Sequence, residues 1–333
     1  MSSIDPHQRQ RDPSLTRPQD TLLSNMGLPH RKSFFPLGFA VDILTNRLEV
    51  LTAAETSFGH RELQHSKTNL EIRIGVSESK STQSPPLPTR RQYNHLYSMM
   101  ADIDNQALLD LRTGSNFVWL STAALKDELY LRHNFLEKVV FLLLGASVVT
   151  DIHAGCVSKR GKGILLCGDS GAGKSTLAYA CARAGWTYTS DDTCYLINDS
   201  VTPRVAGHSH KLRFRPEART LFPELQSRAI TRLMEGKPSI EVSSSDLCLP
   251  VSHEVDVSAI VYLRRSRSSR AALVPLPRGS ATRLMSDELF SAGEIRIKHQ
   301  RVLERLREVA TFELHYESLD QALFALEGLA SAL

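Results

Sequence analysis

Along most of the chain, apolar residues recur at regular intervals. An interval of two residues is typical of a strand, and an interval of about 3.6 residues is typical of a helix. In the first half, a helix is expected at 49–58, where Gly59 ends the pattern. Residues 77–91 are polar and rich in proline, which predicts a loop. From residue 123 to about 148 the period is helical. Strands are expected at 39–44, 70–76, 96–102, 107–111 and 116–120, the last three as an antiparallel meander.

In the second half, shorter strand-like runs are mixed with helical ones. Helices are expected at 177–181, 281–290, 294–309 and 319–333. Strands are expected at 152–157, 164–167, 188–190, 194–197, 211–214, 239–242, 257–263 and 311–316. This mixed order of strands and helices predicts an α/β fold.

The length of 333 residues allows more than one domain. Residues 1–33 are polar, contain several prolines and lack an apolar segment, so we expect a disordered tail and not a secretory signal. We then expect an α+β N-terminal region of unknown role at 34–149. The remaining chain, 150–333, forms the predicted α/β catalytic domain.

Charge and hydropathy exclude several classes of protein. The net charge of +4 is small for this length, and the arginines at 264, 265, 267 and 270 have no aromatic residues between them. We therefore interpret them as a solvated loop and expect no nucleic-acid partner. The longest apolar run, 139–149, is well short of the roughly 20 residues that cross a bilayer, so no membrane segment is expected.

The five cysteines form no Cys-x-x-Cys pair, and most lie in or beside expected core elements. Buried thiols of this kind are typical of a reducing compartment, and we expect a cytoplasmic protein.

One segment carries the clearest chemistry, a glycine-rich loop between an apolar strand and a helix. Its spacing is Gly, four residues, then Gly-Lys-Ser, which is that of a phosphate-binding loop, or Walker A motif. A surface turn with a chance lysine would not require this strand and helix, and a dinucleotide fold would require Gly-x-Gly-x-x-Gly. The predicted nucleotide-binding residues are Gly168, Asp169, Ser170, Gly171, Ala172, Gly173, Lys174, Ser175 and Thr176.

The loop predicts how a nucleotide would be held. Backbone amides and the helix N-terminus attract anionic oxygens. Lys174 would reach the β and γ phosphates of ATP, and Ser175 would bind Mg²⁺.

Phosphate transfer also needs a carboxylate that orders the metal and a group that takes a proton. Asp191 and Asp192 follow a short expected strand, which would place them beside the γ-phosphate if that strand lies parallel and adjacent to the loop strand. One could take the proton of an acceptor hydroxyl and the other could hold Mg²⁺. The alternative is a solvated Asp-Asp turn. His153, expected on the strand paired with the loop strand, is the third candidate, although a lone histidine is more often structural.

These residues together resemble the catalytic core of HPr kinase/phosphorylase. That family has a His-Gly motif, an apolar strand, Gly-Asp-Ser-Gly-x-Gly-Lys-Ser, a helix ending in Arg-Gly, and Ala-Asp-Asp. This chain has His153-Ala154-Gly155, the loop at 168–175, Ala184-Gly185 and Ser190-Asp191-Asp192, at matching intervals. The resemblance is strong over roughly forty residues, and the region before residue 150 is unlike that of the family.

The resemblance implies a mixed-sheet nucleotide domain like that of phosphoenolpyruvate carboxykinases. It also implies transfer of the γ-phosphate of ATP to a protein serine. By matching position, Asp191 would be the general base, Asp192 would support that base or the metal, and His153 would lie near the γ-phosphate. The acceptor would be a protein or peptide serine, HPr-like or not. A homo-oligomer is left open, since classical members form hexamers.

The chain also departs from the family. Thr176 follows the loop serine where the family often has Glu, and the later Leu-Glu-Ile-Arg-Gly-Leu-Gly-Ile segment is not evident. The nearest segment by order is 236–242, where Lys237 is a candidate phosphate contact. Arg213 and Arg215 are expected on one strand face, where they could clamp a phosphate. These departures keep two alternatives open, a nucleotide-binding regulatory module with little transfer activity and a small-molecule kinase.

Overall fold

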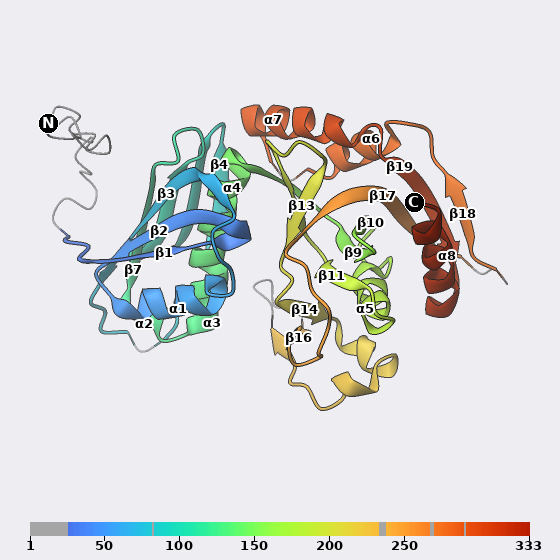
Figure 1. Ribbon diagram of the computed structural model, residues 1–333. Coiled ribbons are helices and arrows are strands. Elements are labelled where there is room, and N and C mark those ends of the chain that lie inside the picture. The colour runs from blue at the N-terminus through green and yellow to red at the C-terminus, as the bar shows by residue number, and fades with distance from the viewer. Residues whose placement is uncertain (1–25, 82, 233–237, 267–269, 290) are drawn as a thin grey trace, which may run out of the picture.

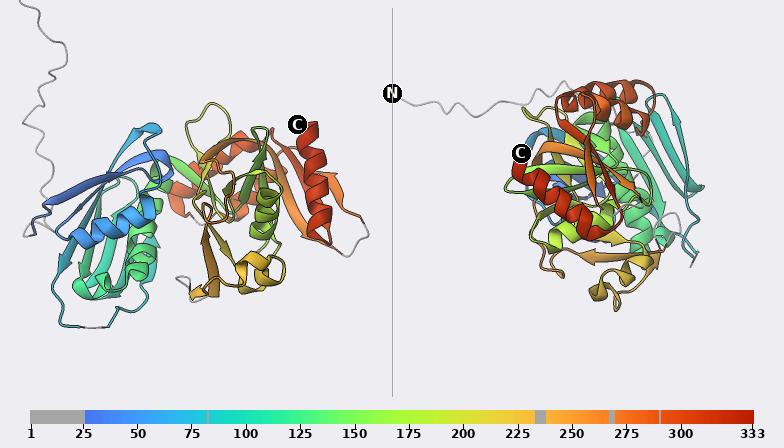
Figure 2. Two further views of the ribbon diagram at one scale, coloured as in Figure 1. Left: turned by 60° about the horizontal axis from the view of Figure 1, so that its bottom comes forward. Right: turned by 90° about the vertical axis from the view of Figure 1, so that its right-hand side faces the viewer.

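The computed structural model describes residues 26–81, 83–232, 238–266, 270–289 and 291–333. The chain has a mixed α/β structure in two parts that lie side by side (Figures 1 and 2). Each part is built on its own large β-sheet. The N-terminal part ends with helix α4 (Glu137–Ser147), and the second part begins with strand β8 (Val149–Ile152).

The N-terminal part contains a seven-stranded sheet in the order β1-β2-β3-β7-β6-β5-β4. Strands β2, β3 and β7 pair in parallel, and the other neighbours pair antiparallel. The meander expected from the sequence is therefore present as β5-β6-β7. The strands are β1 (His30–Phe34), β2 (Phe39–Thr45), β3 (His65–Ser77), β4 (Thr89–Tyr93), β5 (Leu96–Asp102), β6 (Asn105–Asp110) and β7 (Asn116–Ser121).

Helices of the N-terminal part lie together against this sheet (Figure 1). The long helix expected at 123–148 is interrupted, because Asp127 accepts a hydrogen bond from the Tyr130 amide at 2.9 Å and starts a new helix there. A π-helical turn (Arg132–Leu136) then leads into α4. The other helices are α1 (Leu48–Phe58), α2 (Thr122–Leu125) and α3 (Glu128–Leu131).

The second part contains a nine-stranded sheet whose main path runs β11-β9-β10-β17-β13-β12-β8, with β19 between β17 and β18. Strand β10 pairs antiparallel with β9 and parallel with β17. The strands after β8 are β9 (Gly155–Lys159), β10 (Lys162–Cys167), β11 (Thr187–Ser190), β12 (Cys194–Ile197), β13 (Arg204–Gly207), β17 (Glu254–Arg265), β18 (Ala272–Pro275) and β19 (Ala310–Tyr316).

Helices cover both faces of this sheet. On one face α5 (Lys174–Arg183) and α8 (Leu319–Ala332) pack over Ile164 and Leu166 of β10. On the other face α6 (Ser280–Asp287) and α7 (Gly293–Leu303) pack over Leu165 and Cys167. Because both faces are buried, β10 reads as a continuous apolar run without alternation.

The segment after β13 forms a small three-stranded sheet, which lies beside α5. Its strands are β14 (Lys211–Phe214), β15 (Thr231–Arg232) and β16 (Pro238–Ser243). The ring of Phe214 packs edge-on against Tyr179 of α5, with centroids 5.1 Å apart. This contact fixes β14 against the helix that follows the glycine loop.

Two expectations are corrected by these bounds. The tail was expected to reach residue 33, but His30–Phe34 forms β1; as an edge strand it buries only Phe34, so its sequence shows no alternation. Residues 1–25 lie outside the described part. The single strand expected at 152–157 is two strands, because the chain turns at Ala154 to move from a pairing with β12 to one with β10.

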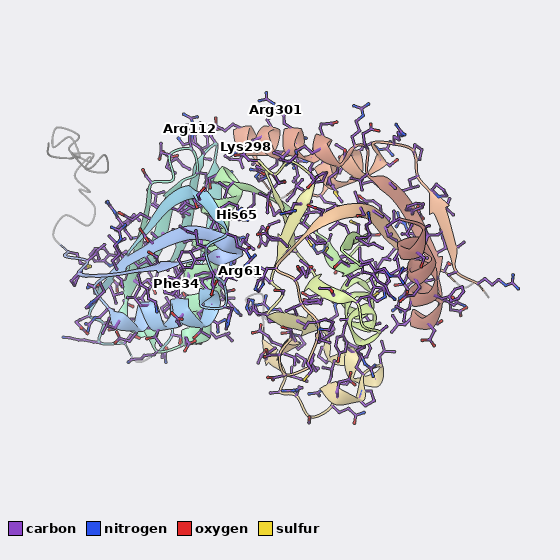
Figure 3. All side chains as sticks on the ribbon, in the orientation of Figure 1. Phe34, Arg61, His65, Arg112, Lys298 and Arg301 are labelled. Carbon is purple, nitrogen blue, oxygen red and sulfur yellow. The ribbon has the colours of Figure 1, made fainter. Side chains whose placement is uncertain are left out.

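The two parts share a hydrophobic core. Phe141 of α4 stacks on Tyr195 of β12 with ring centroids 5.4 Å apart. Lys298 of α7 donates to the carbonyls of Ala146 and Ser147 at 2.8 and 2.7 Å. Figure 3 shows Arg61 and His65 on the side of the N-terminal part that faces the second part. Within the described ranges, no helix is long and apolar enough to cross a membrane.

This shared core predicts that the two parts unfold together. Leu144 of α4 is fully buried, so Leu144→Ala should lower the free energy of unfolding by about 3 kcal/mol. The chain has one tryptophan in each part, Trp119 and Trp186, and single-tryptophan variants report each part separately in urea. The urea concentration at the midpoint of unfolding should decrease by the same amount for both transitions.

The matched control is Leu129→Ala on α3, where the side chain is partly exposed and the loss should be small. A shift of the Trp119 transition alone would contradict the shared core.

Candidate functional site

The glycine-rich loop lies between the carboxyl end of β10 and the start of α5, as the sequence predicts. Gly171 and Gly173 have φ values of 91° and 103°, which side chains rarely adopt. A Cβ atom on Gly173 would lie 2.7 Å from the Tyr316 hydroxyl, which itself donates to the Ala172 carbonyl at 2.7 Å. The loop therefore requires glycine at 173, both for its conformation and for its contact with β19.

Lys174 is the first residue of α5, and its side chain folds back into the loop. Its Nζ donates to the carbonyls of Gly168 at 2.6 Å and Asp169 at 3.3 Å. Burial lowers the pKa of Lys174, and the nearby charge of Asp192 acts in the opposite direction. The ammonium thus lies inside the loop, where phosphate oxygens could replace the two carbonyls as its partners.

Asp191 is buried at the end of β11, beneath the start of α5. The Ser175 hydroxyl donates to its backbone carbonyl at 3.3 Å. Its carboxylate accepts from the Arg213 amide at 2.9 Å and from the Tyr188 hydroxyl at 3.3 Å. Burial raises the pKa of Asp191 to about 6, although the hydrogen bond from Arg213 acts to lower it.

Asp192 has the opposite environment, with a side chain that is 62% exposed. Its Oδ1 lies 3.6 Å from Nδ1 of His153. The structure therefore brings His153, Asp192 and Lys174 together, while the carboxylate of Asp191 points toward β14.

Two positional expectations for these residues are corrected. His153 lies in the connection between β8 and β9, just before the strand that pairs with β10. Strand β11 runs in the same direction as β10 but is not adjacent to it, because β9 lies between them. The Asp pair still reaches the loop, because β10 and β11 end at the same edge of the sheet.

Three arginines surround the loop. Arg215 donates to the Ser170 hydroxyl at 3.0 Å, and Arg264 donates to the Asp169 carboxylate at 3.2 Å. Arg265 lies over the Tyr316 ring, 6.0 Å from its centroid. The expectation of a loop at 264 and 265 is therefore corrected, since these exposed residues end β17, whose parallel pairing with β10 brings them near the glycine-rich loop.

Arg213 does not share the position of Arg215. Its guanidinium donates to Glu241 at 2.8 Å, away from the loop, because β14 ends at Phe214 and the chain turns. The expectation that both arginines lie on one strand face is therefore corrected. Lys237 and Arg267 lie outside the described residues.

Glu288, just beyond α6, is a charged residue that no sequence motif indicates. Burial raises the pKa of Glu288, and the charges of His153 and Lys174 oppose that shift. Its carboxylate therefore lies within electrostatic reach of the loop. No motif surrounds Glu288, so only the packing of α6 on the sheet could have revealed it.

A magnesium ion would have few protein ligands here. The described residues contain no group of three or more His, Cys, Asp or Glu side chains that could hold a metal. Mg²⁺ bound to a nucleotide usually keeps several waters and takes one or two protein oxygens in addition to phosphates. Ser175 and Asp192 remain the predicted ligands, and Thr176 contributes no carboxylate.

Comparisons with known proteins add little to this geometry. No family model and no curated protein matches the chain. Among solved structures, the chain is similar to the HPr(Ser) kinase/phosphatase from Coxiella burnetii, with 11% identity and a TM-score of 0.29. The match covers 55% of this chain and 99% of that one. A similarity of this size assigns neither a fold family nor an activity.

The burial of Asp191 predicts a stability effect that depends on pH. Because its pKa is about 6 in the folded state and 3.8 as its ordinary value, the stability that its protonated form contributes is present at low pH and is lost as the pH rises through 6. Asp191→Asn stays neutral throughout. At about pH 8 this variant should be more stable than the parent by up to about 3 kcal/mol, and the difference should shrink toward about pH 5.

Urea unfolding at both pH values measures this difference. Asp192→Asn is the matched control, and its exposed carboxylate should leave stability nearly unchanged. An Asp191→Asn protein that is less stable than the parent at both pH values would contradict the proposed burial cost.

Proposed function

We propose that this protein is an ATP-dependent phosphotransferase that resembles HPr serine kinase and transfers the γ-phosphate to a serine hydroxyl of a protein or peptide. One observation supports the proposal: Lys174, the exposed Asp192 carboxylate and His153 lie together at one edge of the sheet, and the buried carboxylate of the neighbouring Asp191 is directed toward β14. Nucleotide binding alone would need the loop but not the second group of residues.

The loop and its lysine would bind the triphosphate. Lys174 would exchange the carbonyls of Gly168 and Asp169 for the β and γ phosphate oxygens. Arg215 and Arg264 contact loop side chains and would neutralise phosphate charge. Mg²⁺, held by Ser175, Asp192 and the phosphates, would offset the charge that develops during transfer.

Asp191 is the proposed base for the acceptor hydroxyl. A pKa of about 6 leaves it ionised at neutral pH while keeping it basic enough to accept a proton. Each carboxylate oxygen already accepts one hydrogen bond and retains a further lone pair for the acceptor. His153, 3.6 Å from Asp192, would lie near the γ-phosphate.

A second candidate is a regulatory module that binds nucleotide with little transfer. The burial of Asp191 favours it, because an acceptor hydroxyl must enter a site where that side chain is only 7% exposed. Thr176 in place of an acidic residue also favours it. A small-molecule kinase is the third candidate, with an acceptor small enough to reach Asp191.

Transfer is tested with γ-labelled ATP, Mg²⁺ and a lysate of the host. The parent protein should label a discrete protein, whereas Lys174→Ala should abolish nucleotide binding and therefore labelling. Lys162→Ala, on the exposed start of β10, is the matched control and should behave as the parent. Tight ATP binding without label on any protein would favour the regulatory module.

Asp191→Asn separates binding from transfer. This variant should bind ATP as the parent does and should lose at least about a hundredfold in transfer rate, since it cannot accept a proton. In the parent, kcat/KM should fall as the pH drops through about 6, because protonation removes the base. Transfer by Asp191→Asn at the parental rate would contradict the role assigned to Asp191.

A further inference from the structure

A buried cluster of charges joins the N-terminal part to β14 of the second part. Glu137, the first residue of α4, lies with its Oε1 3.8 Å from Nζ of Lys211. The same ammonium lies 3.8 Å from Oε1 of Glu241 on β16. The side chains of Glu137 and Lys211 are only 17% and 12% exposed. One cation is therefore shared by a carboxylate from each part.

Glu137 is fixed from the N-terminal side. The Ser57 hydroxyl of α1 donates to its Oε1 at 2.9 Å, and Nη2 of Arg132 lies 3.4 Å from the same oxygen. Arg132 also donates to Ser57 at 2.8 Å. Although burial raises the pKa of Glu137, the charges of Lys211 and His133 outweigh it and bring the pKa to about 2. Glu137 is therefore an ionised group held by two N-terminal elements.

Strand β14 connects Lys211 of this cluster to Asp191. Arg213 is two residues further along β14, and its amide donates to the Asp191 carboxylate at 2.9 Å. The guanidinium of Arg213 is held by Glu241 at 2.8 Å, and its Nη2 lies 3.4 Å from Nε2 of His133. The side chains at 211 and 213 thus hold the strand to the N-terminal part, while the backbone at 213 holds Asp191.

The contacts of Lys211 are better suited to fixing the position of β14 than to adding net stability to the fold. Among the residues that the structure describes, none is a hydrogen-bond partner of the buried Nζ of Lys211, and the carboxylates of Glu137 and Glu241 each lie 3.8 Å away and act on it through charge. A buried ion pair of this kind contributes little net stability, because the cost of desolvation offsets the attraction. Its well-attested use is to specify one arrangement among several.

We propose that Glu137 is a positioning residue, which holds Asp191 in place through Lys211 and β14. The placement of the N-terminal part against β14 then sets the rate of phosphate transfer. This inference rests on the proposed function, but the contact from Arg213 to Asp191 can be measured without any activity.

The test uses the full chain with Glu137→Gln, which keeps the size and hydrogen-bonding capacity of the side chain and removes its charge. Hydrogen exchange at the Arg213 amide reports directly on its bond to Asp191. We expect this amide to exchange at least about tenfold faster, while amides of β12 keep their parental protection. We also expect kcat to fall about tenfold with the Kd for ATP unchanged, since the loop is intact.

Two variants complete the design. Glu128→Gln removes a charge that lies 3.8 Å from Arg132 but is 52% exposed, and it should change neither quantity. Glu137→Asp keeps the charge and should restore most of the exchange protection and of kcat. General unfolding would instead speed exchange in β12 as well and would lower ATP affinity, and that result would overturn the positioning role.

The inference also fails if the Arg213 amide is protected from hydrogen exchange to the same extent in the Glu137→Gln variant as in the Glu128→Gln variant. That outcome leaves the proposed function intact if the parent transfers phosphate. A parent that transfers nothing would contradict the proposed function, and the exchange measurement would still decide whether Glu137 orders the contact to Asp191.

Discussion

The short strand β10 is buried on both faces, and every other part of the candidate site is placed relative to its carboxyl end. Its alternate residues belong to two separate hydrophobic clusters, one beneath α5 and α8 and one beneath α6 and α7. The glycine loop begins where this strand ends. Because β9 and β17 pair with β10, they bring His153 and Arg264 to the same edge. Packing in the core thus determines which polar residues meet at the loop.

Burial then gives two neighbouring carboxylates different electrostatic environments. Asp191 is buried, and burial raises its pKa, whereas Asp192 is mostly exposed and helps to keep Lys174 charged. Adjacent residues at the end of a strand point to opposite sides, so a turn of two aspartates offers both environments at once. Burying the ionised carboxylate of Asp191 costs folding free energy, because burial disfavours the charged form.

Much of the nucleotide loop and of the strands around it could be predicted from the sequence. The loop has a fixed spacing, and the local backbone conformation requires its glycines. Most strands of both parts show apolar patterning. Strand β1 could not be predicted in this way, because an edge strand buries too few side chains to show a pattern. The break at Asp127 was also missed, because apolar residues continue on both sides of it.

Contacts between residues that are distant in sequence also limit what the sequence can predict. Arg264, Glu288 and the pair of Glu137 and Lys211 lie far from the loop in sequence, and none belongs to a motif. Their positions follow from the strand order and from the packing of α4 on the second part, which no local pattern encodes. The place of Arg264 and Arg265 at the end of β17 was missed for this reason, since a run of arginines has the same composition in a loop and at the end of a strand.

A crystal structure of the protein with Mg²⁺ and a non-hydrolysable ATP analogue would show where the terminal phosphate lies. We expect Lys174 to leave the carbonyls of Gly168 and Asp169 and to contact that phosphate. That phosphate should lie within a side chain's reach of Asp191, Asp192 and His153. A terminal phosphate directed away from the Asp turn, or a nucleotide bound outside the glycine loop, would contradict this expectation.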